Sequence, residues 1–182
     1  MVNSAGLGPE EVNQLNLQRK SELIDLEIVQ SYCKIPLPSW IELSVVDLCN
    51  RVCEFCPRSD PSIAPNRKHY MTLDLCENLA EQLREAGFSG TIVLGGYGEP
   101  LLHPRVNQII EVFSRVGNTE VVTNGDRLSL EVAQNLVRHG ASKMLVSMYD
   151  GPEQLKKFND VLSAANVPSQ RFLLRPRWHG AE

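Results

Sequence analysis

Three cysteines crowded into eight residues constrain this chain more than any other feature. Cys49, Cys53 and Cys56 form a C-x₃-C-x₂-C spacing directly after the apolar run Trp40 to Val46. The chain has five cysteines in 182 residues, an odd number that does not suit a disulfide framework. Clustered cysteines in a reducing compartment more often bind a metal. The spacing therefore predicts a metal site on a tight loop of a cytoplasmic protein.

Two kinds of metal site fit three thiols. Each thiolate can bind one iron of a [4Fe–4S] cluster, and because such clusters ordinarily have four cysteine ligands, one iron would stay open. The alternative is a structural zinc ion with a Cys₃His ligand set, in which His69 would be the fourth ligand. Structural zinc sites are usually built from paired C-x₂-C sequences, and this chain has one such pair. The spacing therefore favours the cluster.

From about residue 38 onward, short apolar runs alternate with helical patterns. The runs are rich in β-branched or large apolar residues, which suits strands buried on both faces of a parallel sheet. The predicted strands are Trp40 to Val46, Thr91 to Leu94, Glu120 to Thr123, Lys143 to Ser147 and Arg171 to Leu174. The predicted helices are Thr72 to Ala86, Pro104 to about Val116, Ser129 to Gly140 and Pro152 to about Ala165. This alternation predicts an α/β fold with five parallel strands and right-handed crossovers.

The first predicted helix begins at Thr72, a residue type that caps helices. Leu75, Leu79 and Leu83 share one face, which predicts that all three contact the core. Cys76 precedes two of these leucines by three and seven residues, so we expect a buried thiol that takes no part in the metal site.

Residues 1–37 are expected to form an N-terminal helical extension, followed by a core domain over residues 38–182. A helix is predicted from Pro9 to about Gln30, as a cover for the bottom of the barrel or as a partner surface. No run approaches the roughly 18 to 20 apolar residues that span a bilayer, so no membrane association is expected. The net charge of −4 and the lack of a basic run argue against a nucleic-acid partner.

Glycines and polar residues follow the other predicted strands. The loops at the carboxyl ends of parallel strands collect at one end of the sheet, where ligands bind. The loop Gly95 to Pro104 would let the backbone approach a ligand closely, and Glu99 is an acceptor for a cationic ammonium group. His103 in this loop is expected to cap a helix or to pack, with a substrate contact as the alternative. Thr123-Asn124-Gly125 follows the next strand.

The cysteine loop after a first strand resembles the signature of the radical S-adenosylmethionine (radical SAM) enzymes. Phe55 falls at the aromatic position before the last cysteine of that signature. The resemblance implies that Cys49, Cys53 and Cys56 hold a [4Fe–4S] cluster. It also implies that S-adenosylmethionine binds the open iron through its amino and carboxylate groups, with Phe55 near the adenine.

Three further loops resemble motifs of the same family in the same order. Gly96, Gly98, Glu99 and Pro100 match the glycine-glutamate motif that holds the methionine amino group, and the form GEPLLHP is similar to SPASM-type members. Tyr97 departs from the motif, because many members have glycine there. The remaining matches are Thr123 and Asn124, which would line the cosubstrate pocket, and Ser147, which would contact its ribose or carboxylate.

The segment Ser147 to Gly151 has one residue more than the family's Ser-x-Asp-Gly motif. Asp150 in this segment is as readily interpreted as the cap of the following helix. Arg175, Arg177 and His179 follow the last predicted strand, and the sequence leaves open whether they face a substrate or the surface.

The resemblance implies a reaction as well as a fold. One electron from a flavodoxin or ferredoxin would cleave S-adenosylmethionine, and the resulting 5′-deoxyadenosyl radical would abstract hydrogen from an unknown small-molecule or peptide substrate. The family's core is a partial TIM-type barrel that usually has six strands, and five are found here. No cysteine follows Cys76 for auxiliary clusters. The alternative is therefore a catalytically silent iron-sulfur or zinc-binding protein from a truncated chain that binds a partner.

Overall fold

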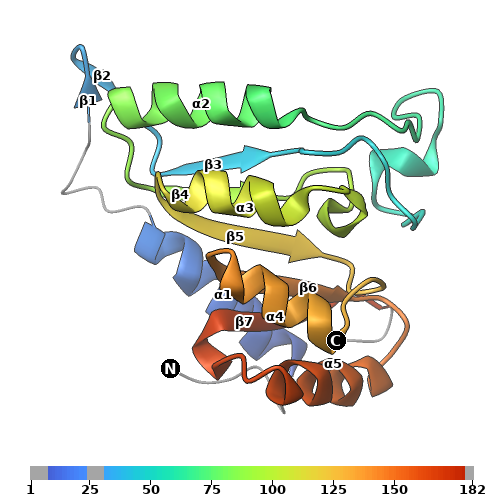
Figure 1. Cartoon of the computed structure of the whole chain (residues 1–182). Coiled ribbons are helices and arrows are strands. Elements are labelled where there is room, and N and C mark those ends of the chain that lie inside the picture. The colour runs from blue at the N-terminus through green and yellow to red at the C-terminus, as the bar shows by residue number, and fades with distance from the viewer. Residues whose placement is uncertain (1–7, 24–30, 179–182) are drawn as a thin grey trace.

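A five-stranded parallel sheet organises the molecule (Figure 1). The computed structural model describes residues 8–23 and 31–178. The strand order along the sheet, β3-β4-β5-β6-β7, follows the sequence. The strands are β3 Trp40–Leu43, β4 Thr91–Leu94, β5 Asn118–Thr123, β6 Ala141–Met148 and β7 Phe172–Pro176. The predicted α/β fold is confirmed, and across the described residues the sheet stays open at β3 and β7.

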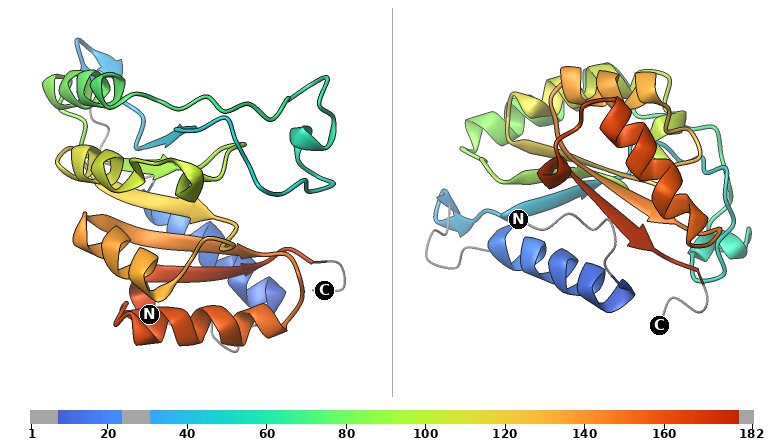
Figure 2. Two further views of the ribbon diagram at one scale, coloured as in Figure 1. Left: turned by 45° about the vertical axis from the view of Figure 1, so that its right-hand side comes forward. Right: turned by 90° about the horizontal axis from the view of Figure 1, so that it is seen from below.

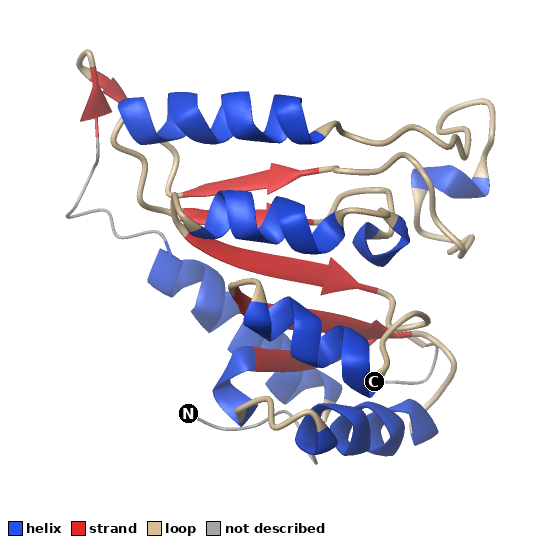
Figure 3. Ribbon diagram, viewed as in Figure 1, coloured by secondary structure: helices blue, strands red, loops and turns tan. Residues whose placement is uncertain are grey.

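The first strand of this sheet is shorter than predicted, because its last residues leave the sheet. Val45 and Val46 are buried, yet the Val45 carbonyl accepts a hydrogen bond from the Met71 amide (2.9 Å), and Val46 forms an antiparallel bridge with Tyr70. These contacts begin the long loop that leads to the first covering helix (Figure 3). A short antiparallel pair, β1 Ser31–Tyr32 and β2 Ile35–Pro36, precedes the sheet and was not predicted.

Four helices cover one face of the sheet. They are α2 Leu73–Glu85, α3 Val106–Ser114, α4 Leu130–Arg138 and α5 Glu153–Ala164. Three single 3₁₀ turns, η1 Pro57–Ser59, η2 Pro100–Leu102 and η3 Ser169–Arg171, lie in the connections. Thr72 caps α2 as predicted, since its hydroxyl accepts a hydrogen bond from the Leu75 amide (3.2 Å).

The prediction that Leu75 of α2 contacts the core is wrong. Leu79 and Leu83 pack against the core, whereas 53% of the surface of Leu75 is exposed. A step of four residues turns a helix by about 40° more than a full turn. Over the two steps from Leu75 to Leu83, the direction of the side chain therefore changes by about 80°. The most buried positions are Cys76 and Ala80, which place Leu75 at the margin of the packed face. The prediction that Cys76 is a buried thiol is confirmed.

Apolar side chains fill the space between the sheet and these helices. Fully buried members of this core are Ile92, Leu94, Val121, Met144, Val146 and Leu174 from the strands, and Ile109, Ile110, Phe113, Leu136, Phe158 and Leu162 from the helices. Burial of a large apolar side chain stabilises a fold by ~1.5–3 kcal/mol. The carboxyl ends of the strands therefore present their loops on a well-packed support.

Helix α1 Pro9–Leu23 lies against the opposite face of the sheet (Figure 2). Val12 packs with Leu145 and Leu173, and Arg19 forms a buried ion pair with Glu120 of β5. The predicted helix therefore covers a sheet face and not the end of a barrel, and its expected continuation over residues 24–30 lies outside the described residues. No helix in the described ranges is long and apolar enough to cross a membrane.

His103 fixes the loop between β4 and α3. Its Nδ1 accepts a hydrogen bond from the Arg105 amide (3.0 Å), so its Nε2 carries the proton and donates to the Met71 carbonyl (3.0 Å). The ring meets Tyr70 edge to face, with 5.4 Å between ring centroids. Burial lowers the pKa of His103. The predicted packing role in a loop is confirmed.

We expect His103 to make the stability of the chain depend on pH. Because the pKa of His103 is lower in the folded state, the unfolded chain binds the proton first, and the free energy of unfolding falls as the pH drops below about 6.5. In His103→Gln, the free energy of unfolding should therefore fall less between about pH 7 and pH 5 than it does in the wild type. Urea unfolding at both pH values measures it, with exposed His69→Gln as control. The same pH dependence in wild type and His103→Gln would contradict the assignment.

Candidate functional site

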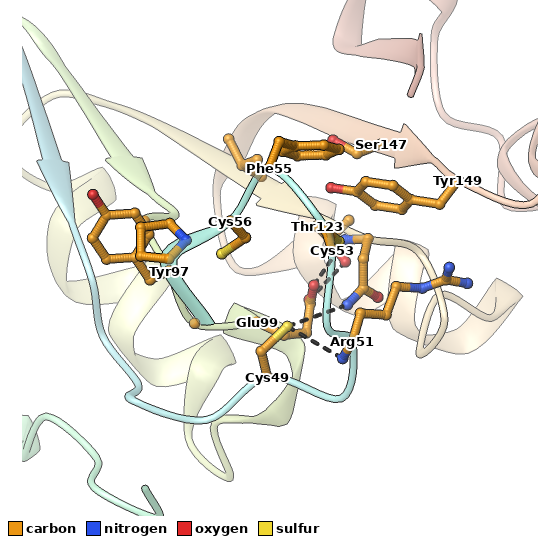
Figure 4. Close-up of a pocket in the computed structure, with 15 residues that line it drawn as sticks. Cys49, Arg51, Cys53, Phe55, Cys56, Tyr97, Glu99, Thr123, Ser147 and Tyr149 are labelled. Carbon is orange, nitrogen blue, oxygen red and sulfur yellow. Dashed lines mark hydrogen bonds between the residues drawn. The ribbon is translucent and has the colours of Figure 1, made fainter. Parts of the chain in front are cut away.

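A cavity of about 240 Å³ lies where the loops at the carboxyl ends of the strands meet (Figure 4). Its walls come from the loops after β3, β4 and β5 and from the end of β6. The lining residues are Cys49, Arg51, Cys53, Phe55, Cys56, Pro57, Gly96, Tyr97, Gly98, Glu99, Val122, Thr123, Asn124, Ser147 and Tyr149. Ten of the eleven predicted site residues are in this set; Pro100 is buried in η2 outside it.

The cysteine loop is held by side chains that the sequence did not single out. The Asn66 side-chain amide bonds both backbone polar groups of Cys49: its Oδ1 accepts from the amide and its Nδ2 donates to the carbonyl, each at 2.8 Å. A turn then forms within the loop, because the Cys56 amide donates to the Cys53 carbonyl (2.9 Å). The three thiols are thereby presented to one cavity by a loop that leaves the sheet.

Arg58 connects the cysteine loop to the glycine-rich loop. It is almost fully buried and donates to the Asp47 carboxylate (2.6 Å), the Pro65 carbonyl (3.0 Å) and the Tyr97 carbonyl (2.5 Å). A buried guanidinium requires such partners, because an unpaired charge away from water is costly. Its position just after Cys56 is the only sequence signal that pointed to it.

The thiols face the cavity in a setting that opposes their ionisation. Burial is the largest cause that raises the pKa of Cys49 and of Cys53, and the neighbouring thiols raise both further. A bound metal centre lowers the pKa of these thiols again, because its ligands are thiolates and binding releases the thiol protons. The donor set therefore fits an iron-sulfur cluster.

The zinc set of three cysteines and His69 is not assembled. The side chain of His69 is exposed and does not line the cavity. Among the residues that the structure describes, no group of three or more His, Cys, Asp or Glu side chains forms a site for a single metal ion.

Glu99 is buried, with 2% of its surface exposed. Its carboxylate accepts hydrogen bonds from the Thr123 hydroxyl (2.7 Å), the Asn124 amide (2.7 Å) and the Leu101 amide (3.1 Å). Burial raises the pKa of Glu99, and these hydrogen bonds oppose the rise. The predicted pocket residues Thr123 and Asn124 thus also orient the carboxylate.

The glycine-rich loop passes close to the chain that follows β3. A Cβ atom at Gly98 would lie 1.8 Å from the Val46 carbonyl oxygen, so only glycine fits there. Gly96 has a φ of 82°, a left-handed conformation that glycine adopts without strain. Tyr97 stands between them with an exposed ring that lines the cavity.

Two aromatic rings from different loops form another wall. Phe55 stacks on Tyr149, with ring centroids 6.1 Å apart and an interplanar angle of 22° (Figure 4). Sequence reasoning missed Tyr149, which lies in the segment that is one residue longer than the family motif. Asp150 does not cap α5: Pro152 holds the cap position without a side-chain bond, and Asp150 pairs with Arg51.

Ser147 and Arg175 lie side by side on β6 and β7. They are register partners in the parallel ladder, and the Arg175 Nη2 donates to the Ser147 hydroxyl (2.9 Å). Burial lowers the pKa of Arg175 to about 10, and its Nε has no hydrogen-bond partner. Arg177 lines a neighbouring cavity of about 310 Å³ with Trp178, while His179 lies outside the described residues.

Known proteins have sequences similar to that of this chain. Residues 43–167 match the sequence model of the Radical SAM superfamily. The S-adenosyl-L-methionine-dependent 2-deoxy-scyllo-inosamine dehydrogenase of Niallia circulans is 33% identical over 128 residues, which cover 68% of this chain and 49% of that protein. The GTP 3′,8-cyclase of Saccharophagus degradans is 30% identical over 130 residues, covering 68% of this chain and 38% of that protein.

A solved structure supports the same relationship. The crystal structure of BtrN in complex with AdoMet and 2-DOIA matches with a TM-score of 0.67 and 29% identity, over 78% of this chain and 57% of BtrN. The chain thus spans about half the length of the relatives it matches. With more than half of its residues matched by the family's sequence model, the chain belongs to the Radical SAM superfamily.

Proposed function

We propose that this chain is the core of a radical SAM enzyme that binds a [4Fe–4S] cluster through Cys49, Cys53 and Cys56. Members of the superfamily use this cluster together with S-adenosylmethionine. The observation that carries the proposal is that three thiols and the buried Glu99 carboxylate line one cavity. When bound, the cluster would pass on one electron from an external donor, which would cleave S-adenosylmethionine to methionine and a 5′-deoxyadenosyl radical that takes a hydrogen atom from the substrate.

The polar residues of the cavity would hold the methionine end of the cosubstrate. Glu99 would accept the amino group, with its carboxylate kept in place by the Thr123 hydroxyl and the Asn124 amide. Ser147 would receive the carboxylate, and behind it the half-buried Arg175, which donates to the Ser147 hydroxyl and has an unpartnered Nε, would add a positive charge that attracts an anion. Together they would orient both charged groups of S-adenosylmethionine.

The aromatic residues would hold the adenosine end, and the glycines would bring the loop of Glu99 close to the cosubstrate. Phe55 and Tyr149 offer stacked rings on the cavity wall, which suits a planar base. Gly96 and Gly98 keep the backbone of their loop close to the cavity. A cosubstrate bound along this wall would itself shield the site from water, and exclusion of water from reactive intermediates is a main task of the protein when the cofactor supplies the chemistry.

The remaining parts of the proposal concern partners and organisation. The electron would come from a flavodoxin or ferredoxin, and the substrate would be a small molecule or a peptide. The names of the two relatives describe a dehydrogenase and a cyclase, so they point to no single product for this chain. A cytoplasmic location and the division into an extension over residues 1–37 and a core over 38–182 belong to the same proposal.

Removal of one proposed ligand should abolish cluster binding and leave the fold intact. After anaerobic reconstitution, the wild type should contain about four iron and four sulfide per chain, and Cys53→Ala should contain little of either. Cys33→Ala is the matched control, because Cys33 is exposed and outside the cavity. Normal iron content in Cys53→Ala, or one zinc per chain in the wild type, would contradict the proposal.

Replacement of Glu99 should separate cosubstrate binding from cluster binding. Glu99→Gln keeps the size of the side chain but loses the charge, so the iron content should stay normal while the affinity for S-adenosylmethionine falls roughly 10–100-fold, as for a lost charge-assisted hydrogen bond. Calorimetry on the reconstituted protein measures the affinity, with the exposed Glu85→Gln as control. An unchanged affinity in Glu99→Gln would remove this residue from the binding site.

Catalysis can be tested without knowledge of the substrate. Protein reduced anaerobically with dithionite should convert S-adenosylmethionine into methionine and 5′-deoxyadenosine, and chromatography detects both products. A protein with a full cluster and bound S-adenosylmethionine that yields neither product would support the catalytically silent alternative.

A further inference from the structure

Two of the three residues between the first and second cysteines, Asn50 and Arg51, bind other loops through their side chains. Arg51 donates through Nε and Nη2 to both carboxylate oxygens of Asp126, at 2.7 and 2.5 Å. Through Nη1 and Nη2 it donates to both oxygens of Asp150, at 2.6 and 2.5 Å. One guanidinium thus binds two carboxylates, each with two hydrogen bonds.

The two carboxylates come from the loops that carry other walls of the cavity. Asp126 lies two residues after Asn124, in the loop after β5, and Asp150 directly follows Tyr149 in the loop after β6. The guanidinium carbon also lies 5.2 Å from the centre of the Tyr149 ring, which stacks on Phe55. Arg51 therefore contacts segments 75 and 99 residues away in the chain.

Asn50 strengthens one side of this arrangement. Its Nδ2 donates to the Asp126 carboxylate (2.6 Å), and its Oδ1 accepts from the Asn124 side-chain amide (2.9 Å). Asn124 in turn binds the Glu99 carboxylate through its backbone amide. A continuous set of hydrogen bonds thus runs from the cysteine loop to the residue proposed to bind the ammonium group.

The ion pairs of Arg51 differ from an ordinary surface ion pair in their exposure and in the number of hydrogen bonds. The side chains of Arg51, Asp126 and Asp150 are 19%, 27% and 53% exposed, so water screens them only in part. The planar guanidinium has five donors in a fixed geometry, so it can give two hydrogen bonds to each of two carboxylates, whereas an ammonium group has only three donors. Networks of this kind contribute more than isolated surface pairs. The Arg51 guanidinium also holds the pKa of Asp150 below its usual range.

We propose that Arg51 is a positioning residue that holds the cysteine loop against the loops after β5 and β6. The wall that would bind the cluster and the wall that would bind S-adenosylmethionine then keep one fixed arrangement. This inference rests on the proposed function for its cofactors, but the loop contacts on which it depends belong to the chain itself.

The first test uses the cluster-free chain. In Arg51→Met, amide hydrogen exchange over residues 49–56 should be at least several-fold faster than in the wild type, because the loop loses four side-chain hydrogen bonds to distant segments. Arg115→Met is the matched control: it removes an exposed arginine that pairs with Glu111 on α3, far along the chain from this loop. The control should exchange like the wild type in residues 49–56.

The second test follows the reconstituted protein. Loss of outer partners of metal ligands typically lowers metal affinity 10–100-fold. Arg51→Met should therefore lose iron to a chelator faster by about that factor, and its affinity for S-adenosylmethionine should fall. Arg51→Lys should recover part of the loss, because a lysine can still pair with one carboxylate.

The outcomes separate this inference from the proposed function. A wild-type chain that takes up no four-iron cluster overturns the proposed function, whereas the exchange result still reports on the loop. Wild-type exchange in Arg51→Met overturns the inference, as does faster exchange with unchanged iron loss and cosubstrate affinity. If Arg51→Met does not fold, Asp126→Asn and Asp150→Asn each remove one carboxylate charge, and the double variant should show the larger effects on exchange and iron loss.

Discussion

The buried carboxylate of Glu99 is the interaction on which the polar wall of the cavity depends. It joins the loop after β4 to the loop after β5 through the Thr123 hydroxyl and the Asn124 amide. Arg58 extends the connection by binding the Tyr97 carbonyl and the Asp47 carboxylate, which precedes the cysteines. The cavity is therefore shaped by polar contacts between loops, and the buried Glu99 and Arg58 side chains require their partners because an unsatisfied polar group away from water is costly.

This arrangement divides the molecule into parts with different sources of stability. Below the loops, the sheet and helices α2 to α5 pack fully buried apolar side chains, as in a conventional α/β core. At the carboxyl end of the sheet, the segment between β3 and α2 has no regular element except the turn η1 Pro57–Ser59. Loss of a single polar contact there is expected to alter the cavity and leave the core intact, which is why variants at the loops can report on function separately from folding.

The sequence predicted the framework well because local signals specify it. Short apolar runs and helix caps such as Thr72 identified all five strands and the four covering helices in their order. One error came from a contact with a distant segment, since the bridge from Val46 to Tyr70 ends β3 early. The other came from the angular spacing of residues in α2, which leaves Leu75 at the margin of the core. The family membership inferred from the motifs is confirmed by the comparisons.

The site was predictable only in part. The cysteines and Glu99 stand in recognisable spacings, whereas Arg51 and Arg58 act through partners as far as 99 and 39 residues away, which no local pattern reveals.

Helix α1 sets a limit on how deep a ligand can enter from the loop side. Its contacts with the face of the sheet opposite α2 to α5 include Leu145, Leu173 and Glu120, and Leu145 lies two residues before Ser147 on β6. A strand advances by about 3.3 Å per residue, so Leu145, which the helix covers, lies only about 7 Å along the strand from that serine. Any bulky or elongated molecule bound here must accordingly extend outward, past the loops, instead of along the interior of the sheet.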